Sequence, residues 1–598
     1  MPEHAKTDWD QRIALRSDER REFAFPDLDP PKEVSAAGGV GHVTIDWSPV
    51  DGAAGYLILR GAGEHGPLEP VDHHSGDVLS VPSPPYVDTT GTPGTPYRYA
   101  VVSVPEVTAV NGRPSHTVGA VPLVAGSIAP TVTVTVDVVA EGTELPRPWV
   151  PMVGSERLSQ LLSTERTGGH EIGVELGAAL RRMHDELRVR TVRAHAIFHD
   201  DTHVIDGDTY DFTTVDKIYD KLLGIGLRPV VELGFMPREL ASDPSRTVFA
   251  YGAIISPPAS YDRWYDLVRA LVHHLVDRYG LDEVLTWDFE VWNEPNLEVF
   301  WSGTKAEYLH LYDVSAAAVK SVDPRLQIGG PSSAAAGWVD DLLDHTKRYG
   351  TPVDFVSTHT YGSPPLDVRA SLERHGYGDA RILWTEWGVT PTHFNPINDS
   401  VFSGVFLLRG MRSAAGRIDA LSYWVASDHF EELGRPPRFL HGGFGLQTVG
   451  GLAKPRYHAL TLLSRLGPVE LPVTYGGDGG GSLVEAWASR DRDRIAVLLW
   501  NLTLDQTKAD GDPGLSRRVQ VQLPGVDPSW QVTATTLAIG TGDLATAAAG
   551  LGDWPTDAEL ADLAERSRMA TTALELYDGA VEVNLPMPSA VLLEITPR

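Results

Sequence analysis

Apolar segments of strand length alternate with amphipathic segments of helical period from Trp149 to Gly467. This alternation is typical of a parallel α/β sheet or barrel, because a helix that covers the sheet joins each pair of parallel strands. The helical period is clearest in SYDRWYDLVRALVHHLVDRYG, which begins at Ser260. Its apolar side chains recur at spacings of three and four residues, at Trp264, Leu267, Leu271 and Leu275.

Eight strand candidates can be counted in this region. They are WVPMVG at Trp149, RTVRAHA at Arg190, RPVVELGF at Arg228, TWDFEVWNE at Thr286, RLQIGG at Arg325, VDFVSTHTY at Val353, RILWTE at Arg381 and IDALSYWVA at Ile418. A (β/α)8 TIM barrel typically takes about 250 residues or more. We therefore predict a TIM barrel over residues 149–467.

The segments on both sides of the barrel are typical of β-sandwiches. In 38–125, short strands such as HVTIDW, YLILR and PYRYAVVSV are separated by turn residues. The stretch 126–148 contains TVTVTV, which we expect to form an accessory strand at a sheet edge, and 468–598 is expected to form a second sandwich. Residues 1–37 are assigned to an N-terminal extension. The predicted fold is multi-domain, a TIM barrel flanked by β-sandwich modules.

The charge and composition of the chain limit the classes of partner that it can bind. Its 598 residues include 80 acidic and 50 basic side chains, a formal net charge of -30. This acidic excess repels phosphate backbones and anionic lipids, so nucleic acid and membrane surfaces are disfavoured and a neutral partner is expected. The absence of cysteine excludes thiolate nucleophiles, disulfides and cysteine-ligated metals.

Two further sequence features bear on location and on metals. The first thirty residues lack the apolar region of a secretory signal, and no apolar run approaches the roughly 20 residues that span a bilayer, so we expect a cytoplasmic protein. The Asp-rich stretch HDDTHVIDGDTYD, which begins at His199, lacks the EF-hand spacing and its closing glutamate. No metal or other cofactor is therefore expected. The oligomeric state stays open, a homo-oligomer included.

Functional groups of a TIM barrel lie at the carboxyl ends of its strands. EVWNEPN places Glu294 at the end of the fourth predicted strand, and LWTEWG places Glu386 at the end of the seventh. Because both strand ends face one pocket, the two carboxylates are expected to meet there. Either glutamate alone is equally well explained as a helix cap or the partner of a neighbouring Arg. The pair together favours a functional interpretation.

Paired carboxylates are what cleavage of a glycosidic bond requires. One carboxylic acid protonates the leaving oxygen while the other carboxylate attacks the anomeric carbon, and a separation of about 5 to 5.5 Å marks the retaining, double-displacement route. A neutral sugar also presents hydroxyls and one apolar face, so its site needs acceptors and a flat aromatic ring.

The region 149–467 resembles glycoside hydrolase family 39, a retaining (β/α)8 family of clan A best known for β-xylosidases and α-L-iduronidases. The resemblance rests on strings in the right order, among them VGSERL, RAHAIFHDD, ELGFMPREL, FEVWNEPNLEVFW, PVDFVSTHTYG, LWTEWG and SYWVASDHFEE. The bacterial β-xylosidases are the more similar branch. In addition, GHVTIDWSPVDGAAGYLILR and YVDTTGTPGTPYRYAVVSV resemble a fibronectin type III domain, which is usually a spacer or an interface.

The family 39 resemblance implies roles for particular residues. Glu294 matches the general acid/base and Glu386 the nucleophile. Asn293 matches the residue that hydrogen-bonds the sugar 2-hydroxyl, and Tyr361 is expected to contact the nucleophile carboxylate. The other matches are substrate-binding positions: His359, the aromatic floor Trp424, the acidic pair Glu431 and Glu432 for the outer ring hydroxyls, and the lesser positions His195 and Phe235.

Two departures from the family pattern affect the expected substrate. Trp387 and Gly388 follow the nucleophile where the xylosidases often carry a polar residue after the aromatic. The loop after the sixth strand is also shorter than in the xylosidases, which would open the aglycone side of the pocket. The substrate is therefore less firmly predicted than the mechanism.

The predicted function is that of a retaining exo-glycosidase of the β-xylosidase type, which releases xylose from the non-reducing end of short β-linked xylo-oligosaccharides. An α-L-arabinoside or α-L-iduronide presents the same absolute configuration at the anomeric carbon and is the alternative substrate. A uronic acid would need a cationic group in the pocket, and Glu431 and Glu432 argue against one. A protein that binds glycans through its sandwich modules without hydrolysing them is a further alternative, but it has no physical need for both glutamates.

Overall fold

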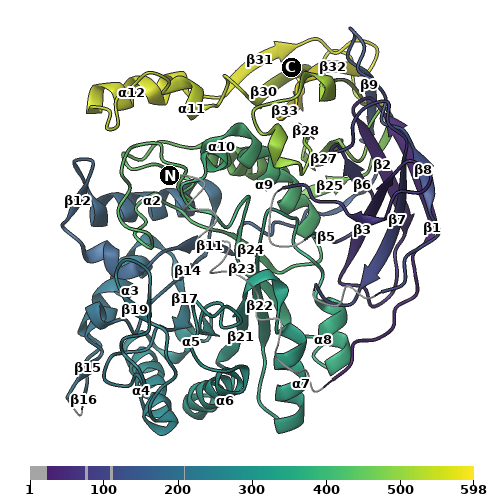
Figure 1. Cartoon of the computed structure of the whole chain (residues 1–598). Coiled ribbons are helices and arrows are strands. Elements are labelled where there is room, and N and C mark those ends of the chain that lie inside the picture. The colour runs from purple at the N-terminus through teal and green to yellow at the C-terminus, as the bar shows by residue number, and fades with distance from the viewer. Residues whose placement is uncertain (1–22, 75–78, 108–111, 208) are drawn as a thin grey trace.

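The computed structural model of the chain describes residues 23–74, 79–107, 112–207 and 209–598, so most of the expected N-terminal extension lies outside the described residues. Eight parallel strands close into a barrel (Figure 1). They are β11 (Met152–Ser155), β14 (Thr191–Ala194), β17 (Arg228–Leu233), β20 (Asp288–Val291), β21 (Gln327–Ser333), β22 (Phe355–Tyr361), β23 (Arg381–Gly388) and β24 (Ala420–Tyr423). Each overlaps one of the eight predicted segments, although β11, β21 and β23 end one to three residues beyond theirs, and the predicted TIM barrel is confirmed.

Helices follow the barrel strands and cover the outside of the barrel (Figure 1). Ser260 caps α4 by accepting a hydrogen bond from the Arg263 backbone, and the four predicted apolar positions of this helix are all buried. The helices of the barrel region are α2 (Ile172–Leu187), α3 (Thr213–Ile225), α4 (Tyr261–Tyr279), α5 (Leu281–Val284), α6 (Lys305–Val322), α7 (Val339–Tyr349), α8 (Arg369–His375), α9 (Val401–Ala414) and α10 (Pro455–Ser464).

Several short elements lie in the loops of the barrel. The Asp-rich stretch after β14 forms a 3-10 turn and part of a small hairpin. These short elements are η1 (Leu158–Leu162), β12 (Arg166–Thr167), β13 (His170–Glu171), η2 (Asp200–Thr202), β15 (Ile205–Asp206), β16 (Thr209–Tyr210), β18 (Thr247–Val248), β19 (Ala253–Ile254), η3 (Ala334–Ala336) and η4 (Pro396–Asp399).

Two antiparallel sheets form a module before the barrel, which we call the N-terminal module. One sheet has the order β1–β2–β6, and the other has the order β4–β3–β7–β8 with β5 paired to β3. The strands are β1 (Lys32–Gly39), β2 (His42–Ser48), β3 (Gly55–Ala62), β4 (Glu69–Pro70), β5 (Ser80–Val81), β6 (Tyr86–Asp88), β7 (Tyr97–Val104) and β8 (Val118–Ala120). The first strand thus begins within the segment assigned to the extension. The likeness of this module to a fibronectin type III domain stays a prediction.

Two further sheets form the C-terminal sandwich. Their orders are β10–β25–β27–β28–β33–β30–β31 and β26–β9–β29–β32. The strands are β9 (Thr131–Val136), β10 (Thr143–Glu144), β25 (Val469–Leu471), β26 (Val473–Gly477), β27 (Val484–Asp491), β28 (Arg494–Asn501), β29 (Arg517–Gln522), β30 (Gln531–Ala538), β31 (Ala570–Leu574), β32 (Ala580–Leu585) and β33 (Ser589–Thr596). The helical segments are η5 (Gln506–Lys508), η6 (Pro513–Leu515), α11 (Leu544–Ala547) and α12 (Asp557–Arg566).

The strand expected at a sheet edge, β9, lies inside the C-terminal sandwich instead. It pairs antiparallel with β26 and parallel with β29. Its alternate residues Val132, Val134 and Val136 are fully buried. An apolar face of this kind needs a second sheet to cover it, which an edge position on an accessory sheet would not supply.

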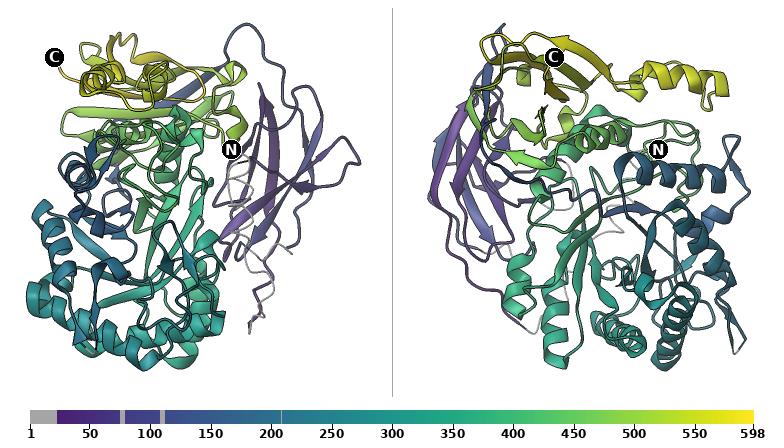
Figure 2. Two further views of the ribbon diagram at one scale, coloured as in Figure 1. Left: turned by 60° about the vertical axis from the view of Figure 1, so that its left-hand side comes forward. Right: turned by 180° about the vertical axis from the view of Figure 1, so that it is seen from behind.

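The N-terminal module packs along one side of the molecule, against both the barrel and the C-terminal sandwich (Figure 2). One continuous apolar core includes Trp47 and Tyr56 of the module together with the side chains around the barrel. The C-terminal sandwich has a separate core between its two sheets. Among the described residues, no helix is both long and apolar enough to cross a membrane.

Candidate active site

Glu386 and Glu294 meet at the carboxyl ends of the barrel strands. Glu386 lies in β23, and Glu294 follows the end of β20. A carboxylate oxygen of each and a ring nitrogen of His359 lie within 4.8 Å of one another. Both carboxylates are nearly buried, with exposed fractions of 8% for Glu294 and 5% for Glu386. The expected meeting of the two carboxylates is therefore present.

The backbone after β20 turns sharply to present its polar side chains. Trp292 and Glu294 adopt left-handed conformations, with φ of 70° and 42°. Such angles are unfavourable for residues with a side chain and persist only where the surroundings hold them. The backbone N–H of Glu294 donates to the Ser332 carbonyl at 2.7 Å, and the Trp292 indole donates to the Phe300 carbonyl at 2.8 Å. These two bonds hold the turn.

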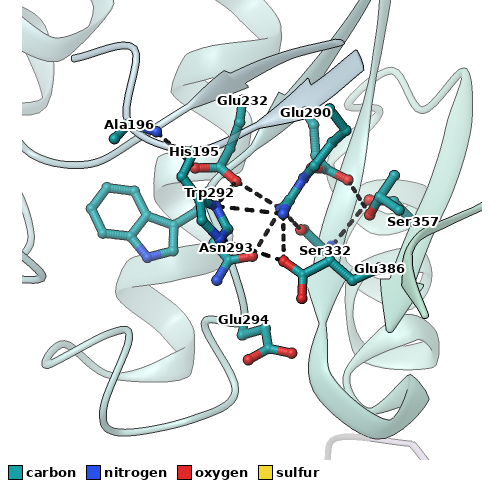
Figure 3. A network of polar contacts seen from close by, with 12 residues as sticks. His195, Ala196, Glu232, Glu290, Trp292, Asn293, Glu294, Ser332, Ser357 and Glu386 are labelled. Atoms are coloured by element: carbon teal, nitrogen blue, oxygen red, sulfur yellow. Dashed lines mark hydrogen bonds and ion pairs between the residues drawn. The ribbon is translucent and has the colours of Figure 1, made fainter. Parts of the chain in front are cut away.

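A fully buried arginine, Arg193 on β14, lies at the centre of the site. Its Nη1 donates to Oε1 of Glu386 at 2.5 Å, and Nη2 donates to Oδ1 of Asn293 at 2.8 Å. Figure 3 shows the side chains that converge from separate strands on this centre, with the Glu294 carboxylate nearby. The other contacts of the guanidinium are Glu290 at 2.8 Å, Glu232 at 2.7 Å and Ser332 at 3.0 Å.

The charges around Arg193 oppose the cost of burying carboxylates. Burial raises the pKa of Glu386 above its ordinary value, while Arg193, His195 and the Tyr361 hydroxyl act in the opposite direction. Burial likewise raises the pKa of Glu232 to about 7 against the effect of Arg193. The guanidinium is therefore the group that allows Glu386 to carry charge inside the barrel.

Tyr361 and His359, both on β22, contact the two glutamates directly. The Tyr361 hydroxyl donates to Oε2 of Glu386 at 2.8 Å, which is the contact expected from the sequence. His359 is fully buried, and its Nδ1 lies 2.9 Å from Oε1 of Glu294 and 3.6 Å from Oε2 of Glu386. Burial, Arg193 and His195 hold the pKa of His359 well below its usual range, so the ring is neutral.

His195, Trp424 and Glu432 form the neighbouring part of the site. The Nε2 atom of His195 lies 3.4 Å from Glu432 and 3.6 Å from Glu386. The rings of His195 and Trp424 are 4.7 Å apart, and the Arg193 guanidinium lies 5.6 Å from the Trp424 ring. Burial and the nearby Glu156 and Glu386 raise the pKa of Glu432 well above its ordinary value. Glu432 therefore favours its protonated form here, which can donate a hydrogen bond.

Glu431 and Phe235, the other two predicted substrate-binding residues, have different surroundings. Glu431 accepts hydrogen bonds from Arg157 at 2.6 Å and Arg435 at 3.1 Å, so its carboxylate is held in an ion-pair network beside the site. Phe235 is fully buried, and its ring packs 5.9 Å from His195 and 5.5 Å from Trp292. Its position indicates that it packs against the His195 ring and helps to hold that ring in place.

The cluster of Glu294, His359 and Glu386 offers three atoms of the kind that ligate metals. The site already holds the Arg193 guanidinium 2.5 Å from Glu386. A metal cation placed between the two carboxylates would be repelled by this fixed positive charge. The donor set is better explained by pairing with Arg193, Tyr361 and His359.

Comparison with known proteins identifies the family. The model for glycosyl hydrolases family 39 matches residues 132–535, about two thirds of the chain. The chain belongs to glycosyl hydrolases family 39. It is therefore a glycoside hydrolase, and its N-terminal module lies outside the matched residues.

Individual relatives support this assignment. A β-xylosidase of Geobacillus stearothermophilus is 36% identical over 382 residues, which cover 58% of this chain and 73% of that protein. The crystal structure of a monomeric β-xylosidase from Caulobacter crescentus CB15 matches with a TM-score of 0.66 at 31% identity, covering 78% of this chain and all of that one. An α-L-iduronidase of Canis lupus familiaris is 28% identical over 204 residues, 31% of this chain and 29% of that protein.

Sequence reasoning missed Arg193 and its partners Glu232 and Glu290. All three lie in strings that carry the family 39 resemblance, but none was considered there. The signal was present, because charged residues in the middle of apolar strands of a buried parallel sheet need a partner inside the barrel. Arg193 also stands two residues before His195, so both side chains lie on the same side of the strand.

Replacing Arg193 with methionine is expected to shift the acid limb of the pH profile of kcat/KM upward by about 1 to 3 pH units, the usual effect of removing an adjacent opposite charge. The sign follows from the charge of the guanidinium: its loss raises the pKa of Glu386, and the nucleophile role that the family resemblance implies for Glu386 requires the ionised form. The measurement is a pH–rate profile of folded variants of this family 39 enzyme. Arg193→Lys keeps the charge and should shift the limb less, and equal profiles for both variants would contradict this assignment.

Proposed function

We propose that the chain is a retaining exo-β-xylosidase, and that Glu386 is its nucleophile and Glu294 its general acid/base. The observation that carries this proposal is the approach of their carboxylate oxygens to within 4.8 Å. This separation is compatible with the roughly 5 to 5.5 Å of retaining pairs and too small for the water that an inverting pair holds across about 6.5 to 9.5 Å. A non-catalytic glycan-binding protein gives no reason for two nearly buried carboxylates to lie so close.

The proposed reaction has two displacement steps. In the first, a carboxylate oxygen of Glu386 bonds to the anomeric carbon while Glu294 donates its proton to the departing glycosidic oxygen. In the second, Glu294 removes a proton from water, the water oxygen bonds to the anomeric carbon, and the ester to Glu386 breaks. The sugar leaves with the anomeric configuration that it had in the substrate.

The side chains around the two glutamates support the role of Glu386 as nucleophile and of Glu294 as acid/base. Arg193 and the Tyr361 hydroxyl each bind a different oxygen of Glu386, which fixes the carboxylate and favours its ionised form. The neutral ring of His359 lies 2.9 Å from Oε1 of Glu294, a contact that adds no fixed positive charge beside a carboxyl group that must hold a proton. Arg193 also binds the Asn293 side-chain oxygen, which leaves the Asn293 amide nitrogen to donate to the sugar 2-hydroxyl.

The surroundings favour a neutral terminal sugar. Trp424 offers a flat apolar face, and His195 with Glu432 offers polar atoms beside it. Arg157, a cationic group beside this part of the site, is bound to Glu431 at 2.6 Å and to Asp201 at 2.7 Å. Its charge is therefore neutralised. A uronic acid, the sugar of the alternative α-L-iduronide, would find no uncompensated cation among these residues.

The decisive experiment combines substrate specificity with product stereochemistry. We expect the aryl β-D-xyloside to be the best substrate in a panel that includes the α-L-arabinoside and α-L-iduronide, and proton NMR to show β-xylose as the first product. Turnover of the arabinoside alone would keep the mechanism and change the sugar. An α-configured first product would overturn the retaining mechanism.

A further inference from the structure

We propose that the N-terminal module positions the catalytic strand β23 through His73, and is thus part of the catalytic unit rather than a spacer. This inference rests on the proposed role of Glu386, which lies in β23. It goes beyond the family relationship, because the module lies before the residues that the family model matches.

The first contact in this path joins the module to the loop after β22. His73 is 2% exposed, and its Nε2 lies 3.3 Å from Oγ of the fully buried Ser363. The other ring nitrogen, Nδ1, has no hydrogen-bond partner among the described residues. Burial lowers the pKa of His73 to about 4, so the ring is neutral near pH 7 and retains one donor and one acceptor. Of the two ring nitrogens, Nε2 is the one that is hydrogen-bonded among the described residues, and its partner is Ser363.

Ser363 connects His73 to the residue next to the proposed nucleophile. Its carbonyl accepts the indole N–H of Trp387 at 2.9 Å. Trp387 directly follows Glu386, and its own carbonyl accepts the backbone N–H of Trp424 at 3.0 Å. One short chain of buried hydrogen bonds therefore runs from the module to both the nucleophile strand and the proposed sugar platform.

A second contact fixes His73 itself and reaches β23 from the other side. The His73 carbonyl accepts the backbone N–H of Gln506 at 3.1 Å, and the Gln506 side chain donates to the Val389 carbonyl at 2.5 Å. Val389 is the residue after the end of β23. The C-terminal sandwich and the N-terminal module thus meet at the carboxyl end of this strand.

The loop after β22 also contacts the module at Leu366 and Asp367. The Asp367 backbone N–H donates to the Ala54 carbonyl at 3.1 Å, and a Cβ added at Gly55 would lie 2.9 Å from Leu366. This is the loop whose shortness was expected to open the aglycone side. The module packs against this loop and restrains it.

The test compares variants of the full chain. We expect His73→Ala and Ser363→Ala each to lower kcat by about tenfold with KM within about twofold, because small misplacements of a reacting group cost rate rather than binding. The double variant should be no slower than the single ones, as for two residues that act through one bond. His73→Gln places an amide nitrogen near the position of Nε2 and should recover most of kcat.

Thr44→Val is the matched control. Thr44 bonds to Ser482 of the C-terminal sandwich at 2.8 Å, so this variant also removes a hydrogen bond of the module but leaves the path to β23 intact. We expect it to keep kcat. Unchanged kcat in His73→Ala and Ser363→Ala, with a loss of stability equal to that of Thr44→Val, would overturn the inference.

Hydrogen exchange provides a readout that needs no substrate. The amides of 384–389 should exchange faster in His73→Ala than in wild type and Thr44→Val, with His73→Gln between. Unchanged exchange in His73→Ala would also contradict positioning. If the wild type hydrolyses no xyloside, the proposed function fails, and faster exchange confined to His73→Ala and Ser363→Ala would still support the positioning of β23.

Discussion

Glu386→Gly is expected to lower kcat on aryl β-xylosides by about five orders of magnitude, or about 7 kcal/mol of transition-state stabilisation. The variant removes the only atom that the proposed mechanism uses to attack the anomeric carbon. It also leaves space beneath the sugar for a small anion. Added azide should therefore restore turnover, with the α-xylosyl azide as the product, since azide would attack from the vacated side.

The controls for this experiment are the wild type with azide and Glu283→Gln. Glu283 pairs with Arg228 at the amino-terminal side of the barrel strands, so its loss should leave kcat unchanged. The wild type should form no α-azide. Residual activity of Glu386→Gly within tenfold of wild type, or a β-azide product, would rule out Glu386 as the nucleophile.

Glu294→Ala is expected to affect substrates according to their leaving groups. Hydrolysis of xylobiose should fall by about three orders of magnitude, because general acid catalysis contributes roughly 10²- to 10⁴-fold. A dinitrophenyl xyloside needs no protonation of its leaving group, so the first step on this substrate should be nearly as fast as in wild type. The slow second step, which needs a base, should then show as a burst of dinitrophenolate.

Azide also distinguishes the two glutamates. In Glu294→Ala the glycosyl ester to Glu386 still forms, so azide in place of water should give the β-xylosyl azide, opposite in configuration to the product from Glu386→Gly. The rate of dinitrophenyl xyloside turnover should rise with azide concentration. Equal losses on xylobiose and on the dinitrophenyl xyloside would show that Glu294 does not act as the acid.

Regular patterns in the sequence predicted the barrel well. Each of the eight strands overlaps an expected segment, because a buried parallel strand needs a continuous apolar run and each crossover helix shows its own period. The expected contact between Tyr361 and Glu386 is also present at 2.8 Å. The interior placement of β9 was not predicted, because its partners β26 and β29 lie more than 300 residues later in the chain.

The partners of Arg193 could not be predicted from the sequence. A charged residue in an apolar strand indicates a buried partner but not which one. Glu232, Glu290 and Glu386 come from three other strands, and only closure of the barrel brings their carboxylates to the same guanidinium. The same holds for Glu431, whose partner Arg157 stands 274 residues earlier.

The sequence by itself determined the kind of protein this is: local apolar periods specify the barrel, and the strand-end strings around Glu294 and Glu386 indicate the family. Tertiary structure alone decided which charges pair in the site and what the N-terminal module contacts. The physical reason is the range of the forces involved. Periodicity acts over neighbouring residues, whereas ion pairs and buried hydrogen bonds depend on distances in space between residues far apart in the chain.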